Sequence, residues 1–306
     1  MPSKQSLRLL AATFVGRPSP DPRVGARVGL RAIIRRFPLS SYFALAYAIS
    51  VISLIVLGPP PLAPGAQRNF LPLVLFPVMV IWVGAAGFAL TALGAGQEGI
   101  RETRSRMGRW RQAPGWYAAS ALIPPAAILL VLTALTHVVS PVFTPNLYPL
   151  GLTFGIVAAF FEEIGWSGYA YPRLRSRFGP LTGALLLGLL WGLWHLPVVD
   201  SLGVASPHGA AWAAFFAAFV ALVAGLRVLI CWIYNHTNSV LLAQIMHASF
   251  TGFLVVLGAP AVSPSQEALW YALDAGVLWL VAAAVVTCGG FRYRGTPDAG
   301  LEPLQV

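Results

Sequence analysis

Long apolar runs separated by short polar segments make up most of this 306-residue chain. A helix needs about 20 residues to cross a bilayer, and the pattern predicts an all-α membrane protein, a bundle of about eight transmembrane helices. The runs lie near residues 41–58, 70–96, 114–139, 150–169, 180–199, 210–233, 239–258 and 269–288.

The composition agrees with a polytopic membrane protein. Hydrophobic residues make up 57% of the chain and charged residues 10%, and the mean hydropathy is +0.73, outside the range of soluble globular domains. The net charge of +10 is attributed to basic residues in the loops on the cytoplasmic side of a membrane protein. We therefore expect no nucleic acid as a partner. The two cysteines, Cys231 and Cys288, fall in apolar runs and predict no disulfide framework.

The basic residues orient the predicted bundle. With the amino terminus inside, 18 of the 20 basic residues fall on the cytoplasmic side, in residues 1–40, 101–111, 173–177 and 292–294. Arg68 then lies outside, and Arg227 lies near the inner end of the sixth run. The positive-inside rule predicts that both termini are cytoplasmic, and we expect a bacterial cytoplasmic membrane. An organelle transit peptide is the alternative interpretation of the arginine-rich start.

The same pattern divides the chain into four parts. Residues 1–40 form a basic cytoplasmic arm, and residues 41–149 hold three transmembrane helices. Residues 150–258 are the core helices with buried polar side chains, and residues 259–306 are the last helix and a cytoplasmic tail. Within this plan His208 falls in a loop, where a solvated or capping role is expected.

Two adjacent carboxylates, Glu162 and Glu163, interrupt the fourth apolar run. Ionisable groups inside a membrane are costly and usually functional. If the run is helical, Gly151, Gly155 and Glu162 share a small-residue face that another helix can approach closely. Glu163 points about 100° away, with Ser167 one turn further along. The acids therefore cannot share one role, although a structural pair, each neutralised by a hydroxyl or an arginine elsewhere, also fits.

Histidines occur in two further apolar runs. His195 lies one turn after Trp191 in the fifth run, and Gln244, His247 and Thr251 share one face of the seventh. Three polar groups on one stripe of a spanning helix must face protein or water, not lipid. Singly, His195 also fits an interfacial or hydrogen-bonded role at a helix end. Together, the acids, imidazoles and hydroxyl would line a polar intramembrane cavity and supply what amide hydrolysis requires.

The order and spacing of these residues resemble the CPBP family, the CAAX proteases and bacteriocin-processing enzymes, over about residues 150–255. The family's first motif is Glu-Glu-x-x-x-Arg, which is matched at Glu162 and Glu163, but Ser167 stands in place of arginine.

The other two motifs of that family are also matched with one change each. Phe-x-x-x-His is matched at His195, with Trp191 replacing phenylalanine, and His-x-x-x-Asn is matched at His247, with Thr251 replacing asparagine.

The resemblance implies an intramembrane endopeptidase in which each of these residues has a specific role. Glu162 with His195 would activate the attacking water, and Glu163 would order that pair. His247 with Thr251 would form the oxyanion site, and Ser167, Trp191 and Gln244 would support these groups. Loss of the motif's arginine removes a fixed positive charge that would hold Glu163 ionised. The expected partners are a peptide or protein substrate at the membrane and the lipid bilayer.

Three alternatives stay open. The family's pattern favours chemistry without a cofactor, but Glu162, His195 and His247 would also suit a zinc site. Ser167 lies in Gly-Trp-Ser-Gly, so a rhomboid-like serine protease with His247 as base is possible. A catalytically inactive immunity or scaffold protein of the same fold also fits, because two motif positions are replaced.

At 1.5 Å per residue, the predicted span limits place Glu162 and His247 about 12 Å from the inner boundary and His195 about 20 Å from it. The three groups would then lie at unequal depths.

Overall fold

The computed structural model describes residues 22–58, 71–205 and 207–292, and within these ranges the chain is helical, with no strand. Its α-helices are α2 (Pro22–Arg36), α3 (Pro38–Leu57), α4 (Leu71–Met107), α5 (Pro114–Val138), α6 (Gly151–Gly165), α7 (Tyr171–Phe178), α8 (Pro180–Trp194), α9 (Val199–Leu202), α10 (Trp212–Thr237), α11 (Val240–Val256) and α12 (Pro264–Thr287). Short 3₁₀ segments, η1 (Pro141–Phe143) and η3 (Gly209–Ala211), and a π-helical turn, η2 (Trp166–Ala170), complete the order.

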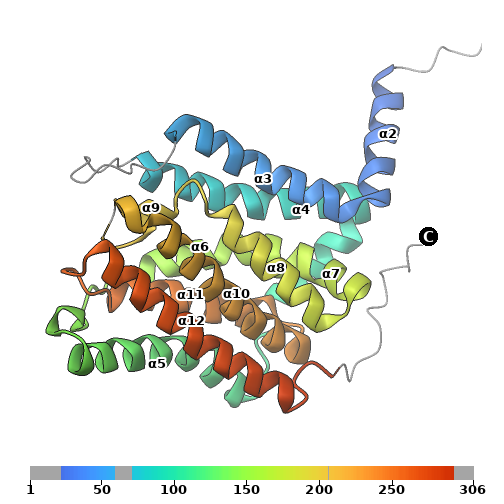
Figure 1. Ribbon diagram of the computed structural model, residues 1–306. Helices are drawn as coiled ribbons and strands as arrows, with labels where there is room; N and C mark the ends of the chain where they lie inside the picture. Colours follow the sequence, from blue (N-terminus) through green and yellow to red (C-terminus); the bar gives the residue numbers. More distant parts are fainter. Residues whose placement is uncertain (1–21, 59–70, 206, 293–306) are drawn as a thin grey trace, which may run out of the picture.

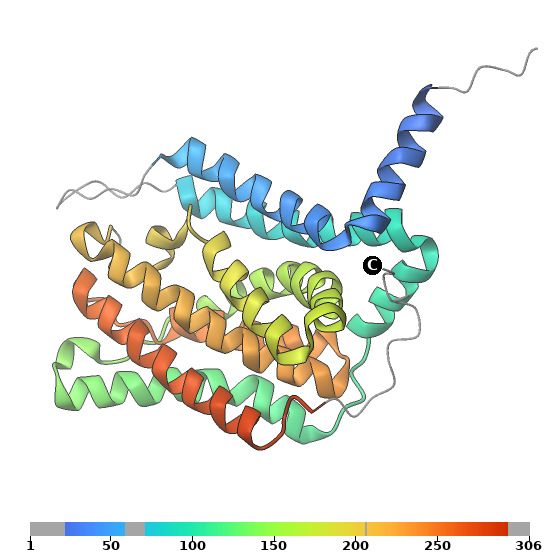
Figure 2. The same cartoon turned by 45° about the vertical axis from the view of Figure 1, so that its right-hand side comes forward.

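The helices form a bundle in which α6, α8, α10 and α11 lie between two outer pairs (Figures 1 and 2). The outer pairs are α3 with α4 on one side and α5 with α12 on the other. Within the centre, α6 packs on α4 and α11, while α10 packs on α8 and α12. The acids of α6 are therefore enclosed by helices rather than facing lipid.

Five helical segments within the described residues are long and apolar enough to cross a membrane. They are Pro38–Leu57, Val74–Met107, Pro114–Val138, Gly209–Thr237 and Pro264–Thr287, while α8 and α11 are apolar but shorter. The predicted all-helical membrane bundle is confirmed. Of the predicted basic arm, residues 1–21 lie outside the described residues, residues 22–36 form α2, which leaves the bundle at one end (Figure 1), and residues 38–40 begin α3.

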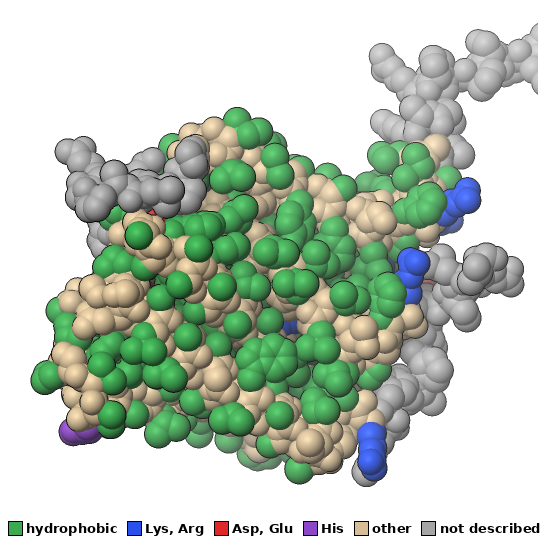
Figure 3. All heavy atoms as spheres, in the orientation of Figure 1, with side chains coloured by type: hydrophobic (Ala, Val, Ile, Leu, Met, Phe, Trp, Pro, Cys, Tyr) green, Lys and Arg blue, Asp and Glu red, His purple; other side chains and the backbone are tan. Residues whose placement is uncertain are grey.

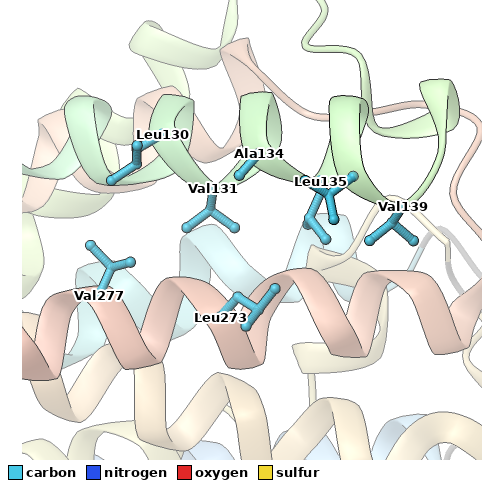
Figure 4. A pocket seen from close by; sticks show the side chains of 8 residues that line it. Leu130, Val131, Ala134, Leu135, Val139, Leu273 and Val277 are labelled. Carbon is cyan, nitrogen blue, oxygen red and sulfur yellow. The ribbon is translucent and has the colours of Figure 1, made fainter.

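The surface matches this architecture. Figure 3 shows a face dominated by hydrophobic side chains, with arginine side chains gathered mainly at the end that carries α2. Two apolar grooves mark the outside of the bundle, one of about 310 Å³ between α5 and α12 (Figure 4) and one of about 610 Å³ along α8 and α10. None of the candidate catalytic residues lines either groove.

The fourth helical run is longer than the predicted span 150–169. α6 passes through η2 directly into α7, so the chain is helical from Gly151 to Phe178. Pro172 does not break it, because it lies just after the π-helical turn η2, where the regular α-helical hydrogen bonding is already interrupted. Gly179, with a positive φ of 81°, makes the turn into α8.

This extension removes the predicted mismatch in depth. Counted from the turn at Gly179, Glu162 lies 17 residues before it and His195 lies 16 residues after it. At 1.5 Å per residue, both groups lie roughly 24–26 Å along their helices from the same turn. The carboxylate of Glu162 accepts a hydrogen bond from Trp191, which lies one helical turn before His195 on α8.

Glycines set the contact between α6 and its neighbours. A Cβ atom added at Gly155 would lie 2.5 Å from the carbonyl oxygen of Ala248 and from the backbone nitrogen of Gly252. On α8, a Cβ atom at Gly188 would lie 2.9 Å from the Cα atom of Ala224. At Gly155 and at Gly188 the helices thus pack closely, with backbone against backbone.

A buried histidine fastens the segment after α8 to α12. His208 Nδ1 lies 2.6 Å from Asp200 Oδ1, and Nε2 lies 3.0 Å from Glu267 Oε2. Glu267 also accepts the N–H groups of Val204 and Ala205, each at 2.6 Å. The expectation of a solvated His208 is wrong, because this side chain is fully buried.

Both ring nitrogens of His208 face carboxylate oxygens, which favours the imidazolium form. Burial works against the charged ring, but the hydrogen bonds to Asp200 and Glu267 and the charges of these two acids outweigh it, so the pKa of His208 is raised. The connection is therefore strongest when the ring is protonated.

We expect Gly155→Val to lower the unfolding temperature of the detergent-solubilised protein strongly, because the backbone of α11 cannot retreat. Overpacking typically costs about 1–3 kcal/mol. Gly276→Val on α12 is the matched control, since nothing lies within 4 Å of a Cβ atom there. Equal unfolding temperatures for the two variants would contradict the close contact.

The raised pKa of His208 predicts a pH-dependent stabilisation. It is fully present below the unfolded value of about 6.5 and is lost as pH rises through the higher folded value. The difference in unfolding temperature between the unmodified protein and His208→Gln should therefore be larger at pH 6 than at pH 9. His236→Gln is the control substitution, since His236 is exposed and its Nδ1 atom lies 3.0 Å from the carbonyl oxygen of Trp232 rather than from a carboxylate.

Candidate active site

Glu162 is held on one side only. Its Oε2 atom accepts hydrogen bonds from the indole nitrogens of Trp191 at 2.7 Å and Trp166 at 3.1 Å. Its Oε1 atom is buried and has no hydrogen-bond partner among the described residues. A buried carboxylate oxygen without a donor is costly, so this atom calls for a functional explanation.

The π-helical turn η2 follows the two acids directly. It holds Trp166 and Ser167, which donate to Glu162 and Glu163 respectively, each four residues back along the chain. Single π-helical turns interrupt α-helices most often at functional sites. The local helix thus supplies one donor to each acid.

Glu163 is satisfied on every side. Its Oε2 atom accepts from Arg227 Nη1 at 2.8 Å and from the hydroxyl of Ser167, and its Oε1 atom accepts from Arg227 Nη2 at 2.9 Å and from His247 Nδ1 at 2.8 Å. The carboxylate and the guanidinium are both fully buried. The two neighbouring acids therefore occupy different environments, as their directions on the helix predicted.

Arg227 was missed as a functional residue by the sequence reasoning. The expectation that Ser167 leaves Glu163 without a fixed positive charge is wrong, because Arg227 on α10 supplies that charge. The signal was present in the sequence, since α10 is an apolar helix of 26 residues with one arginine in its interior. A charge inside a membrane span calls for a named partner, but Arg227 was used only to predict the orientation of the bundle in the membrane.

His195 lies at the end of α8 with a defined tautomer. Its Nδ1 atom lies 2.9 Å from the carbonyl oxygen of Trp191. A carbonyl oxygen only accepts, so Nδ1 carries the proton and Nε2 keeps a lone pair in the neutral ring. The aromatic rings of Phe219 and Trp194 pack against the imidazole, with centroids 5.1 Å and 4.9 Å away.

His247 is oriented by Glu163. The carboxylate accepts from its Nδ1 atom, so Nε2 is directed away from the ion pair. This differs from the arrangement that the resemblance implies, because Glu163 contacts His247 rather than the pair of Glu162 and His195. Glu162 is therefore held by the N–H groups of Trp191 and Trp166 and not by Glu163.

Trp191 connects all of these groups. Its indole nitrogen donates to Glu162, its carbonyl oxygen accepts from His195, and its ring packs edge-on against His247 with a centroid separation of 4.9 Å. The guanidinium carbon of Arg227 lies 4.1 Å from the centroid of the same ring. A phenylalanine here would keep the ring contacts but lose the hydrogen bond to Glu162.

The remaining predicted residues lie at the edge of this cluster. Gln244 donates to the carbonyl oxygen of Phe160 at 2.9 Å and so ties α11 to α6. Thr251 is half-buried, one turn beyond His247, and makes no hydrogen bond within the described part of the chain.

The side chains present give little support to a metal centre. Among residues 22–58, 71–205 and 207–292, no group of three His, Cys, Asp or Glu side chains is placed to hold a metal ion. The guanidinium of Arg227 between Glu163 and Trp191 also adds a positive charge, which would repel a bound cation.

The fold and the site define a polytopic helical membrane protein with a buried cluster of glutamate, histidine and tryptophan. Residues 143–253 match the family described as "Type II CAAX prenyl endopeptidase Rce1-like". This segment runs from η1 into α11 and contains every candidate catalytic residue, and the match confirms the resemblance to the CAAX proteases.

A curated relative gives the same assignment. The "CAAX prenyl protease 2" of Methanococcus maripaludis is 31% identical over 148 residues, which are 47% of this chain and 49% of the relative. The chain thus spans about half the length of the curated relative that it matches.

Proposed function

We propose that this protein is an intramembrane endopeptidase that hydrolyses a peptide bond with water activated by Glu162. The observation that carries the proposal is the buried Oε1 atom of Glu162, which has no hydrogen-bond partner among the described residues while Oε2 is held by two indoles. A carboxylate fixed in this way can accept a proton from a water molecule without having to reorient. Family membership of the segment around it supports the same reaction.

In the proposed reaction, the water oxygen attacks the scissile carbonyl carbon while its proton passes to Glu162. His195 presents the lone pair of Nε2 and assists in orienting the water. The tetrahedral intermediate carries its negative charge on the former carbonyl oxygen. When the carbon–nitrogen bond breaks, Glu162 returns the proton to the leaving amine.

His247 is assigned to the developing negative charge. Its Nδ1 atom is anchored on Glu163, and a protonated Nε2 atom would donate to the oxyanion, an interaction worth roughly 10²–10³ in rate for a single donor. We keep Thr251 as a second donor in the proposal, since it lies on the same helix one turn away.

The reaction is proposed to be metal-free. The buried ion pair between Glu163 and Arg227 supports this. The guanidinium of Arg227 already supplies the positive charge that stabilises the Glu163 carboxylate, so no metal ion is needed for that purpose.

The rhomboid-like alternative has less support. Ser167 is fully buried and donates its hydroxyl proton to Glu163, and His247 Nδ1 also contacts Glu163, not Ser167. A serine nucleophile would need a base as its hydrogen-bond partner. The inactive-scaffold alternative is weakened by Arg227, which restores the charge that the motif had lost.

The proposed substrate is a peptide or protein held at the membrane and cut near its carboxyl terminus. The name of the curated relative makes a prenylated peptide ending in a Cys-aliphatic-aliphatic-X sequence the first substrate to test. We also propose that both termini face the cytoplasm, which is supported by the arginines gathered at the end with α2.

We expect Glu162→Gln to lower kcat on such a peptide by roughly 10²–10⁴, the contribution of a general base. The amide keeps an acceptor for the indole N–H groups but cannot take a proton from water. Ser167→Ala should retain measurable activity, because this hydroxyl supports Glu163 and is not the nucleophile. Product release followed by mass spectrometry measures both variants.

The reverse pattern, with Ser167→Ala inactive and Glu162→Gln active, would establish the serine mechanism instead. Full activity of both variants would place the chemistry elsewhere. If Glu162→Gln restores the phenotype of a strain that lacks the gene, the non-enzymatic scaffold becomes the better account.

Activity should survive exhaustive chelation. The unmodified protein, dialysed against a strong chelator and measured for bound zinc by elemental analysis, should keep its kcat within about twofold. Stoichiometric zinc that tracks activity through removal and reconstitution would overturn the metal-free mechanism.

A further inference from the structure

We propose that Arg227 is a positioning residue that replaces, from a different helix, the arginine absent from the first motif. It holds Glu163 as a carboxylate and thereby fixes the tautomer of His247. This inference rests on the proposed function for its catalytic consequence, but the charge relationship itself can be measured without activity.

The two positions converge in space although they lie 60 residues apart in the sequence. Arg227 Nη1 is 3.4 Å from the hydroxyl oxygen of Ser167, the residue at the motif's arginine position. The guanidinium of Arg227 thus lies beside residue 167, the position that holds the arginine in the family's first motif. The small serine leaves room for it there, and Ser167 and Arg227 are both fully buried.

The geometry of the ion pair suits a positioning role. Two nitrogens of Arg227 contact both oxygens of Glu163, at 2.8 Å and 2.9 Å, which fixes the plane of the carboxylate. The face of Trp191 supports the guanidinium from the other side. Glu163 therefore has one orientation, in which Oε1 is presented to His247.

The influence of Arg227 passes to His247 through Glu163. An ionised Glu163 can only accept at Oε1, so His247 Nδ1 must carry the proton. If Glu163 takes up a proton, it becomes a donor, and Nδ1 can accept instead. The imidazole would then lose the negative partner that stabilises a protonated Nε2. Arg227 acts on the reaction without contact to the substrate.

The decisive variant exchanges the two side chains. The double substitution Ser167→Arg and Arg227→Ser keeps the buried atoms and the charge but moves the arginine back to α6. Arg227→Gln and Arg227→Lys are the single variants, and Arg177→Gln on the exposed end of α7 is the matched control. Unfolding temperature in detergent identifies any variant that fails to fold.

Two readouts are needed. Infrared spectroscopy of the purified protein at neutral pH detects a protonated carboxyl group, and Glu163→Gln assigns its band. The second readout is kcat and KM for peptide cleavage, with the pH profile of kcat. We expect Arg227→Gln to show the protonated band and a kcat lowered by roughly 10²-fold or more, with KM changed little.

The exchange variant should lack the protonated band and recover most of the lost kcat together with the original pH profile. Arg227→Lys should fall between, because lysine keeps the charge but cannot contact both oxygens in one plane. Arg177→Gln should match the unmodified protein in every readout.

A folded exchange variant that remains as inactive as Arg227→Gln would overturn the replacement. So would a folded Arg227→Gln protein with no protonated carboxyl band, because Glu163 would then keep its charge unaided. If the unmodified protein cleaves no peptide, the proposed function fails, whereas the infrared comparison still decides whether Arg227 controls the charge of Glu163.

Discussion

The buried contact between Glu163 and Arg227 is the interaction on which the rest of the site depends. A carboxylate and a guanidinium withdrawn from water are each costly, and neither can be left alone in the bundle. Their pairing draws α6 and α10 together, and the remaining oxygen contact brings in α11 through His247. A pair of this kind contributes little net stability, but leaving either partner alone would be strongly destabilising.

Around this pair, the protein gives two adjacent glutamates opposite surroundings. Glu163 is saturated by charged and polar donors, whereas Glu162 meets only the N–H groups of two tryptophans and keeps one oxygen unpartnered among the described residues. Neutral donors stabilise a carboxylate less than a guanidinium does. Adjacent identical residues thus differ in their readiness to accept a proton, because the helix directs one toward α8 and the other toward α10.

Much of this arrangement follows from the helical periodicity of the sequence. The rest depends on contacts between positions far apart in the sequence, which periodicity does not predict. The small faces of α6 and α8, the divergence of the two acids and the gathering of polar residues from three runs were predictable from 3.6-residue spacing. The pairing with Arg227 was not, because it joins positions 64 residues apart. The continuation of α6 into α7 was not predicted, because the apolar run on which the predicted span rests ends just before the arginines of residues 173–177. His208 was misplaced because loop residues are expected at the surface.

The ion pair also has a consequence for how the chain enters the bilayer. The ribosome completes Glu162 and Glu163 before Arg227, and α6, with 15 residues, is not among the helices that are long and apolar enough to cross a membrane. During synthesis the two acids must therefore remain protonated, hydrated or sheltered by the insertion machinery until α10 arrives. The ion pair therefore couples the burial of the two acids on the earlier helix α6 to the arrival of the later helix α10.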